Sequence, residues 1–438
     1  MQDTSTSVNA HFLQHLLKLS AQEEVKFTED VFSASGVKLI GKGTRISEGL
    51  YDRIVTHKLM KPLEGSISVG DPVTPHALAT TAEMLLDSSP SLAKLLGRDA
   101  PEEGMLGIVQ RASFGEQAGS LLKVHEARLP TSLSHGVLVG LLSTGMMKRL
   151  RPGDAAALDE LIVASIFHDI GELYIDPALH AARTAPLTPE EWRQMAAHPA
   201  IGHAVLKNMG GVAPAVAELV LEHHERLDGC GYPQGRDRTR ISEAGHVLAV
   251  AEALSQFVGR HEEPFAYAEI ALKIMPGEFS QAIIDVVAAC REELRAAHIL
   301  QTELDAQSGV HRTPADYQAD MVGLFSKIGK IVEAMAVLEQ SPRSPALSKV
   351  LSECHQRFER ITRAISSTGL DLALDGGALS EASPDEIKQI KLEFDATLRE
   401  VRWRLVELSR RLTLQGLTLS SNEAVLLLPL RTALAQEL

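Results

Sequence analysis

Seven side chains that could bind metal ions lie between residues 135 and 252: His135, His168, Asp169, His198, His223, His224 and Glu252. Each falls at or near the end of a helical pattern, and helices that end together can bring distant residues to one point. A single histidine in a helical protein is more often a packing or surface residue than a ligand. The combination is more specific, because one histidine directly precedes an acid, two histidines are adjacent, and Glu252 interrupts the apolar run VLAVAEAL.

The types of these side chains restrict the metal and the number of ions. Imidazoles and carboxylates without a thiolate suit iron, manganese or zinc, and do not suggest a structural zinc site. Five histidines and two carboxylates exceed the ligand number of one tetrahedral ion, whereas two ions bridged by Asp169 would use them all. An ionised Glu252 on an apolar helix face would be costly to bury unless it were paired or bound to metal.

Helical patterns account for the placement of these residues. Pro214 opens one of the expected helices, and Ser242 caps another. Thr188 and Glu191 form a capping box with Pro189 between them, and we expect that helix to end at His198 because Pro199 cannot continue it. The expected helices cover residues 133–150, 155–171, 188–198, 214–224 and a segment from 242 that carries Glu252.

Several motifs resemble one known family. FHDIG at His168 and Asp169 resembles the signature of the HD metal-dependent phosphohydrolase superfamily, and HHERLDGCGYP at 223–233 resembles the diagnostic stretch of its HD-GYP branch. LTPEEWRQMAAHPAIGHAVL is similar to the segment that links the two motifs, and SHGVLVG places His135 at the first ligand position. The resemblance covers about residues 120–290, and it implies a helical domain with a metal centre.

The resemblance also implies roles for individual residues. One metal ion would be held by His135, His168, Asp169 and Glu252, and the other by Asp169, His198, His223 and His224. His168 and Asp169 would be catalytic, with Asp169 bridging two ions, iron or manganese, and a hydroxide between the ions would attack the phosphate. Substrate would be bound by the GYP loop and its neighbour, namely Asp228, Gly229, Gly231, Tyr232 and Pro233.

The substrate that the resemblance implies is cyclic di-GMP, hydrolysed in bacterial second-messenger signalling. The expected product is linear pGpG, and a second cleavage would give GMP. The resemblance also implies diguanylate cyclase domains as partners that dock through the GYP loop.

The chain departs from the family pattern at four places. Glu172 replaces the lysine that usually follows HDIG, and Glu252 replaces an aspartate. The stretch 261–269 lacks the arginine that usually contacts substrate, and Thr131 stands where members with three metals place a glutamate. Two alternatives to a cyclic di-GMP phosphodiesterase therefore remain. One is an inactive HD-GYP domain that acts as a metal-containing nucleotide receptor or interaction scaffold, and the other is an HD hydrolase of another nucleotide.

The whole chain of 438 residues predicts a mainly α protein with three domains. We expect an N-terminal α+β regulatory or docking unit at 1–112, a metallohydrolase domain at 113–300 and a C-terminal bundle at 301–438. A hairpin is expected in VFSASGVKLIGKGTRI, and three heptad seams beyond residue 300 predict helices that pack within the chain or, alternatively, form a homodimer.

Composition restricts the partners and the location. A formal charge of -14 argues against polymeric nucleic acid. The chain has no signal-peptide pattern or long apolar run, so we expect a cytoplasmic protein. Three distant cysteines without a CxxC spacing predict free thiols.

Overall fold

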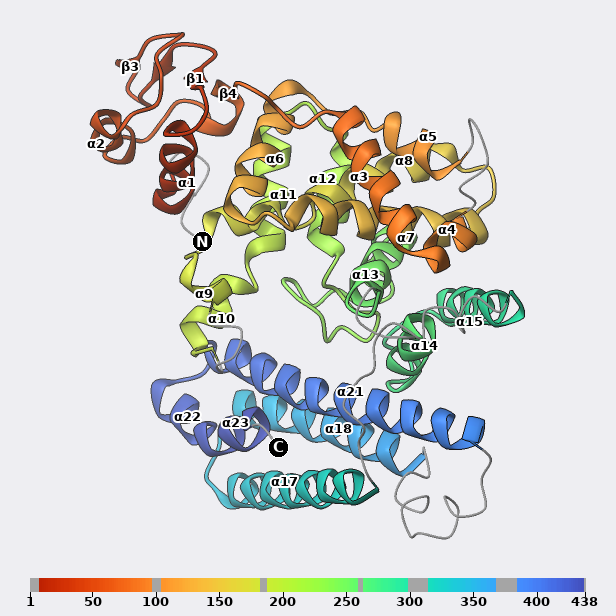
Figure 1. Ribbon diagram of the computed structural model, residues 1–438. Coiled ribbons are helices and arrows are strands. Elements are labelled where there is room, and N and C mark those ends of the chain that lie inside the picture. The colour runs from red at the N-terminus through yellow and green to blue at the C-terminus, as the bar shows by residue number, and fades with distance from the viewer. Residues whose placement is uncertain are drawn as a thin grey trace. The chain divides into compact units, whose positions relative to one another are not determined.

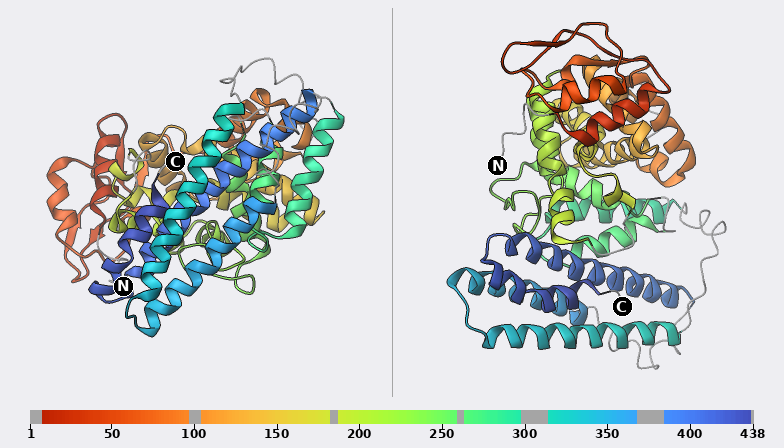
Figure 2. Two further views of the ribbon diagram at one scale, coloured as in Figure 1. Left: turned by 90° about the horizontal axis from the view of Figure 1, so that it is seen from below. Right: turned by 90° about the vertical axis from the view of Figure 1, so that its left-hand side faces the viewer.

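The computed structural model describes residues 8–96, 104–181, 187–258, 263–297, 314–367 and 384–436. The chain divides into two compact units (Figures 1 and 2). Unit 1 comprises residues Met1–Arg183, Gln194–Arg260 and Ser280–Leu300, and unit 2 comprises Thr184–Arg193, His261–Phe279 and Gln301–Leu438. The predicted helical class is confirmed. The three-domain division stays a prediction, and its boundary at residue 300 lies outside the described residues.

Unit 1 begins with a small α+β arrangement. Asn9 caps the first helix by accepting from the backbone N–H groups of His11 and Phe12. Two antiparallel pairs follow, β1 with β4 and β2 with β3, and the second pair confirms the predicted hairpin. The elements are α1 (Ala10–Ser20), β1 (Val25–Phe27), β2 (Val31–Phe32), β3 (Lys38–Ile40), η1 (Glu48–Leu50), α2 (Tyr51–Val55), η2 (Leu63–Ser66) and β4 (Ile67–Val69).

Helices make up the rest of unit 1. They are α3 (Pro75–Ser88), α4 (Pro90–Leu96), α5 (Met105–Gln110), α6 (Glu116–Arg128), α7 (Ser132–Leu150), α8 (Ala155–Phe167), η3 (Ile170–Tyr174), α9 (Ala178–Ala181), α11 (His198–Met209), α12 (Pro214–Glu222), α13 (Glu243–Ser255) and α15 (Gln281–Ala296). The short helix α10 (Pro189–Met195) crosses the boundary between the units in the chain.

The centre of unit 1 is the packing of α7 against α8 and α13. Helix α8 buries every residue from Leu161 to Phe167, which explains why it reads as apolar all round. Glycines on α7 let the backbones approach, since a Cβ at Gly136 would lie 3.1 Å from the Cα and carbonyl oxygen of Ile166. The ends of these helices are therefore held by close packing.

Two predicted helix ends are wrong. The helix that begins at Ala155 ends at Phe167 instead of Gly171, and the 3-10 helix η3 follows it. The capping box of Thr188 and Glu191 forms as expected, but the helix that it opens ends at Met195 instead of His198. Pro199 lies in the first turn of the following helix, where its missing N–H costs no hydrogen bond. His198 is therefore the first residue of α11.

Unit 2 is held together by the heptad seams. Its elements include α14 (Pro264–Lys273), α17 (Pro314–Gln340), α18 (Pro345–Ser367), α21 (Pro384–Gly416), α22 (Ser421–Leu426) and α23 (Leu428–Ala435). Almost all of the predicted seam residues of α17, α18 and α21 are buried in one shared apolar core, and Ile328 is partly buried against it. The three long helices lie side by side in both figures, and the seams pack within the chain.

Two further sequence predictions concern the whole chain. In the described part, no helix is both long and apolar enough to cross a membrane. All three cysteines are reduced thiols as predicted, with Cys290 and Cys354 buried and Cys230 half-buried.

Candidate metal centre

The seven predicted ligand residues lie in one cluster in unit 1, at the ends of five helices. His135 lies in the first turn of α7, and Glu252 lies near the end of α13. His168 and Asp169 follow α8, His198 begins α11, and His223 and His224 follow α12. Close backbone packing holds two of these ends together, since a Cβ at Gly171 would lie 2.0 Å from the carbonyl oxygen of His198. The glycine of the FHDIG motif thus allows α11 to start beside Asp169.

Three of the histidines are fixed by the same local hydrogen bond. The Nδ1 atom of each lies close to the backbone carbonyl oxygen three residues earlier: His168 to Ser165 at 2.6 Å, His198 to Met195 at 2.8 Å, and His223 to Val220 at 2.6 Å. A carbonyl can only accept, so Nδ1 carries the proton and Nε2 of the neutral ring is left with its lone pair. This arrangement orients imidazoles as ligands through Nε2.

The Asp169 carboxylate lies between two groups of histidines. Its Oδ2 atom is 3.1 Å from His168 Nε2 and 3.8 Å from His135 Nε2. Its Oδ1 atom is 3.3 Å from His198 Nε2 and 3.7 Å from His223 Nε2. Each oxygen therefore faces a different group, which is the arrangement that a carboxylate bridging two ions requires.

Glu252 completes the first group. Its Oε2 atom is 3.1 Å from His135 Nε2 and 3.4 Å from His168 Nε2. Buried Glu252 Oε2 and His168 Nε2 have no hydrogen-bond partner among the described residues. The longer side chain of glutamate thus reaches the position at which a ligand is expected.

The contacts within the cluster fit bound cations. His198 Nε2 and His223 Nε2 lie 3.1 Å apart, and because both Nδ1 atoms face backbone carbonyls, a proton between the two Nε2 atoms requires one ring to be an imidazolium. With both rings neutral their lone pairs would face each other, and an ion about 2.0–2.1 Å from each nitrogen would bind both. Ligand atoms within 4.8 Å of one another form two groups, one of Asp169, His198, His223 and His224 and one of His135, His168 and Asp169.

Burial and charge set the protonation of these groups. Burial, together with the rings of His168 and His198, lowers the pKa of His223 to about 3, so this imidazole is neutral at neutral pH. Burial would raise the pKa of Asp169, but the nearby His168 and His198 hold it well below its usual range. Burial would lower the pKa of His168 and of His198, but the Asp169 carboxylate raises both above the usual value. The site therefore presents an ionised Asp169 and a neutral His223, and a cation bound at His168 and His198 would replace their protons.

The GYP loop covers one side of the cluster. The Tyr232 ring stacks on the His224 ring with centroids 4.5 Å apart, and its backbone N–H donates to the His224 carbonyl oxygen. Gly231 has to be glycine, because a Cβ there would lie 2.4 Å from the Cα of Glu225. Gly229 adopts a positive φ of 71°. The predicted loop thus lies against the second ligand group.

Glu172 is buried beside the cluster, where the family pattern has a lysine. Its side chain is 3.7 Å from the Arg128 guanidinium, at the end of α6. Burial and the nearby Asp169 carboxylate raise the pKa of Glu172 to about 7. Arg128 was not among the predicted site residues, since 44 positions separate it from Glu172 and no local pattern links them.

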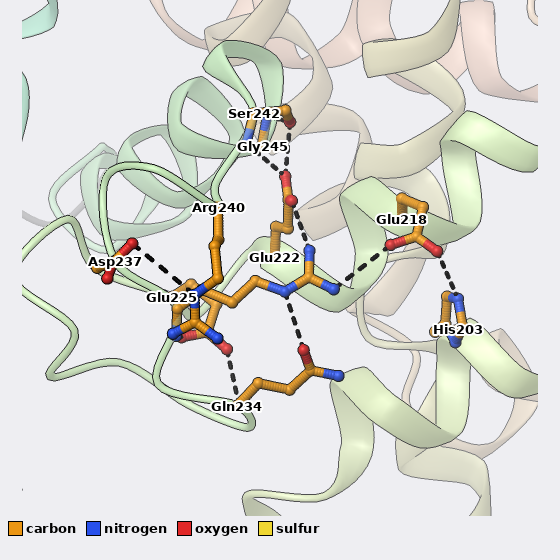
Figure 3. Close-up of polar contacts among 10 residues, drawn as sticks. His203, Glu218, Glu222, Glu225, Gln234, Asp237, Arg240, Ser242 and Gly245 are labelled. Carbon is orange, nitrogen blue, oxygen red and sulfur yellow. Dashed lines mark hydrogen bonds and ion pairs between the residues drawn. The ribbon is translucent and has the colours of Figure 1, made fainter.

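The acids that lie beside the GYP loop were also not among the predicted site residues. Glu222 and Glu225 flank the two adjacent histidines, and both are buried with carboxylates bound by loop groups. Figure 3 shows Glu222 directed toward Ser242 and Gly245, away from His203. The one available signal was Glu222 itself, a charged residue that directly follows the apolar stretch 219–221 at the end of α12.

Comparison with known proteins gives a consistent result. Residues 121–285 match the family described as HD domain. The chain is 34% identical over 127 residues to a cyclic di-GMP phosphodiesterase of Thermotoga maritima, which covers 29% of this chain and 34% of that protein. It is 33% identical over 119 residues to a cyclic di-GMP phosphodiesterase of Pseudomonas aeruginosa, covering 27% and 28%.

A third relative is named for a different substrate. The chain is 29% identical over 164 residues to a 3'3'-cGAMP-specific phosphodiesterase of Vibrio cholerae, covering 37% of this chain and 35% of that protein. The chain thus spans about a third of the length of these curated relatives. Together with the FHDIG and GYP motifs, the matches show that residues 121–285 of this chain are an HD domain of the HD-GYP kind.

Proposed function

We propose that the HD domain is a metal-dependent phosphodiesterase that hydrolyses cyclic di-GMP to linear pGpG, from which a second cleavage gives GMP. The observation that carries the proposal is the position of Asp169, whose two oxygens face two separate groups of imidazoles. His135, His168 and Glu252 would hold one divalent ion with Asp169, and His198, His223 and His224 would hold the other. Iron or manganese fits this donor set.

Bound ions would activate water and stabilise the attacking and leaving oxygens of the phosphodiester. The protein's own residues have two tasks in this reaction. The backbone carbonyls that accept from His168, His198 and His223 keep their Nε2 atoms directed into the cluster. Tyr232, Asp228 and the glycines of the loop would line the substrate site beside His224.

The test is product analysis after incubation with cyclic di-GMP and added iron or manganese. We expect pGpG to accumulate with the wild-type protein, and the product to be lost in Asp169→Ala. A parallel reaction with 3'3'-cGAMP separates the two substrate classes named for the relatives. Hydrolysis of 3'3'-cGAMP alone would contradict the proposed substrate while leaving the hydrolase intact.

A second candidate function is a metal-containing nucleotide receptor or interaction scaffold without turnover. The observation that favours it is Glu172, which places a carboxylate beside Arg128 where the family pattern has a lysine. Glu172→Lys distinguishes the two candidates. A large gain in turnover would show that the missing cation limits the wild-type protein, and little change would show that it does not.

A further inference from the structure

A buried carboxylate connects the segments that carry half of the ligand cluster. Glu222 is the last residue of α12, directly before His223, and is 4% exposed. Its Oε2 atom accepts from the Ser242 hydroxyl at 2.5 Å and from the Ser242 N–H at 3.2 Å, at the start of α13. Its Oε1 atom accepts from Arg236 Nη1 at 2.7 Å. One side chain thus joins the end of α12, the start of α13 and the segment after the GYP loop.

Arg236 is the centre of these contacts on the loop side. Its Nε donates to Gln234 Oε1 at 2.9 Å, and its Nη2 lies 3.5 Å from Glu218 Oε2. Figure 3 shows Glu218, Glu222 and Gln234 directed toward the same point from α12 and the loop. The arginine is largely buried, with its side chain 15% exposed. A planar guanidinium can make these contacts at once, which a single ammonium cannot.

The backbone of the same segment is attached to α12 independently. The N–H groups of Gln234 and Arg236 donate to the Glu225 carboxylate at 2.7 and 2.8 Å. These bonds hold the exit of the loop, and the packing of Gly231 holds its middle. Between these points lies Tyr232, whose ring stacks on His224. The position of the loop exit therefore determines how Tyr232 covers the second ligand group.

We propose that Arg236, through its ion pair with Glu222, is a positioning residue that holds the GYP loop over His224. The consequence for substrate binding rests on the proposed function, and the consequence for loop motion does not. The Arg236 guanidinium bonds to Gln234 and to Glu222 and Glu218 of α12, so its effect on the ligand residues is transmitted by Gln234, Tyr232 and α12. Outer contacts of this kind typically change activity or metal affinity by about 10–100-fold.

The first experiment compares Arg236→Leu, Arg236→Lys and the control Arg240→Leu in the full chain. Arg240 lies in the same segment with its side chain 55% exposed, and it donates to the Gly235 carbonyl oxygen. Hydrogen exchange of residues 228–236 and the KM and kcat for cyclic di-GMP are measured. We expect Arg236→Leu to speed the exchange and raise KM by about tenfold, with a smaller change in kcat. Arg236→Lys should recover part of both effects, and Arg240→Leu should resemble wild type.

A second experiment separates positioning from a loss of stability. Arg236→Leu leaves the buried Glu222 carboxylate without its cation, which could by itself destabilise unit 1. The double variant Arg236→Leu/Glu222→Leu removes both charges and should recover thermal stability. If Arg236 positions the loop, exchange at 228–236 stays fast in the double variant. Slow, wild-type exchange in that variant, or in Arg236→Leu itself, would overturn the inference.

The two readouts also separate this inference from the proposed function. Hydrogen exchange and thermal unfolding need no turnover. If the wild-type protein does not hydrolyse cyclic di-GMP but exchange responds as described, the proposed function fails and the positioning role stands. If KM is unchanged in Arg236→Leu while the wild type is active, the link from loop position to substrate binding is overturned.

Discussion

The ligand cluster of unit 1 and the apolar core of unit 2 are both built from helices, but the helices meet in different ways. In unit 1, five helix ends meet, and their buried residues include imidazoles and carboxylates. In unit 2, the long helices meet along their whole length through apolar seams such as that of Leu398, Val401 and Leu405. Helix ends concentrate donor atoms at a point, whereas seams spread apolar burial over many turns. The difference places the proposed metal centre in unit 1.

Unit 2 also buries charged side chains, which differ from those of the ligand cluster in how their charges are compensated. Glu278 is 0% exposed there, with Arg404 Nη1 at 3.1 Å and Arg357 Nη2 at 3.9 Å from its oxygens. These charges are opposite in sign and compensate one another within the protein. In the ligand cluster, by contrast, imidazole nitrogens of His198 and His223 lie 3.1 Å apart beside the Asp169 carboxylate. The buried charges around Glu278 compensate one another within the protein, whereas the donor atoms of the ligand cluster fit added cations.

The largest change in stability is expected for a substitution in the apolar core of unit 2. Leu405 is 0% exposed in the α21 seam, so Leu405→Ala should lower the free energy of unfolding of unit 2 by about 2–5 kcal/mol. Metal content should stay as in wild type, because the side chain belongs to the apolar core. Urea unfolding and elemental analysis check the two parts. Val332→Ala, at a 51% exposed position of α17, is the control and should change stability by less than about 0.5 kcal/mol.

The substitution Gly171→Ala in unit 1 should lower both the stability and the metal content of the protein. Gly171→Ala would place a Cβ 2.0 Å from the His198 carbonyl oxygen, so the α11 start has to move away from Asp169. We expect a loss of about 1–3 kcal/mol in stability together with a large loss of bound metal. Gly49→Ala is the matched control, since no atom lies within 4 Å of a Cβ there. Normal metal content in Gly171→Ala would contradict the role assigned to this close contact.

A pH dependence is expected in the N-terminal part of unit 1. Burial, followed by Arg128, Lys18 and His11, lowers the pKa of His15 to about 4. The unfolded chain therefore takes up a proton near pH 6.5 that the folded chain does not, and stability falls as pH drops from about 6.5 to about 4. With an allowance for solvent screening, this contributes about 1–2 kcal/mol.

The contribution of His15 is measured as a difference between variants, because other groups titrate in the same range. His15→Leu should lose less stability than wild type between pH 7 and pH 4.5 in urea unfolding. The exposed His76, changed to leucine, should leave the pH dependence as it is. Equal slopes for wild type and His15→Leu would show that His15 is not the group responsible.

The smallest expected effect is a gain in the stability of unit 2. Gly329 lies inside α17 with open space around it, so Gly329→Ala meets no neighbouring atom. The substitution should stabilise the helix by about 0.5–1 kcal/mol through backbone entropy and helix propensity. Thermal or urea unfolding measures it. Together with Gly171→Ala, it tests whether glycines are required near the ligand cluster and dispensable in the long helices.

The sequence predicted the parts of the fold that depend on local pattern. Heptad spacing identified the seams of α17, α18 and α21, and the motifs around His168 and His223 identified residues that the structure brings together. The start of α11 at His198 was missed, because a proline is compatible with ending one helix or opening the next. Arg128 and Arg236 were missed for another reason. Each of these arginines pairs with residues that are distant or irregularly spaced in the sequence, so only the three-dimensional structure identifies the partners.

The measurement that most directly tests the two-metal centre is elemental analysis of protein purified without oxygen. We predict about two iron or manganese ions per wild-type chain, since two ligand groups share Asp169. We also predict that Asp169→Ala binds neither ion tightly while remaining folded by circular dichroism. Wild-type protein that takes up no metal when iron or manganese is supplied would contradict the account, as would Asp169→Ala with both ions retained.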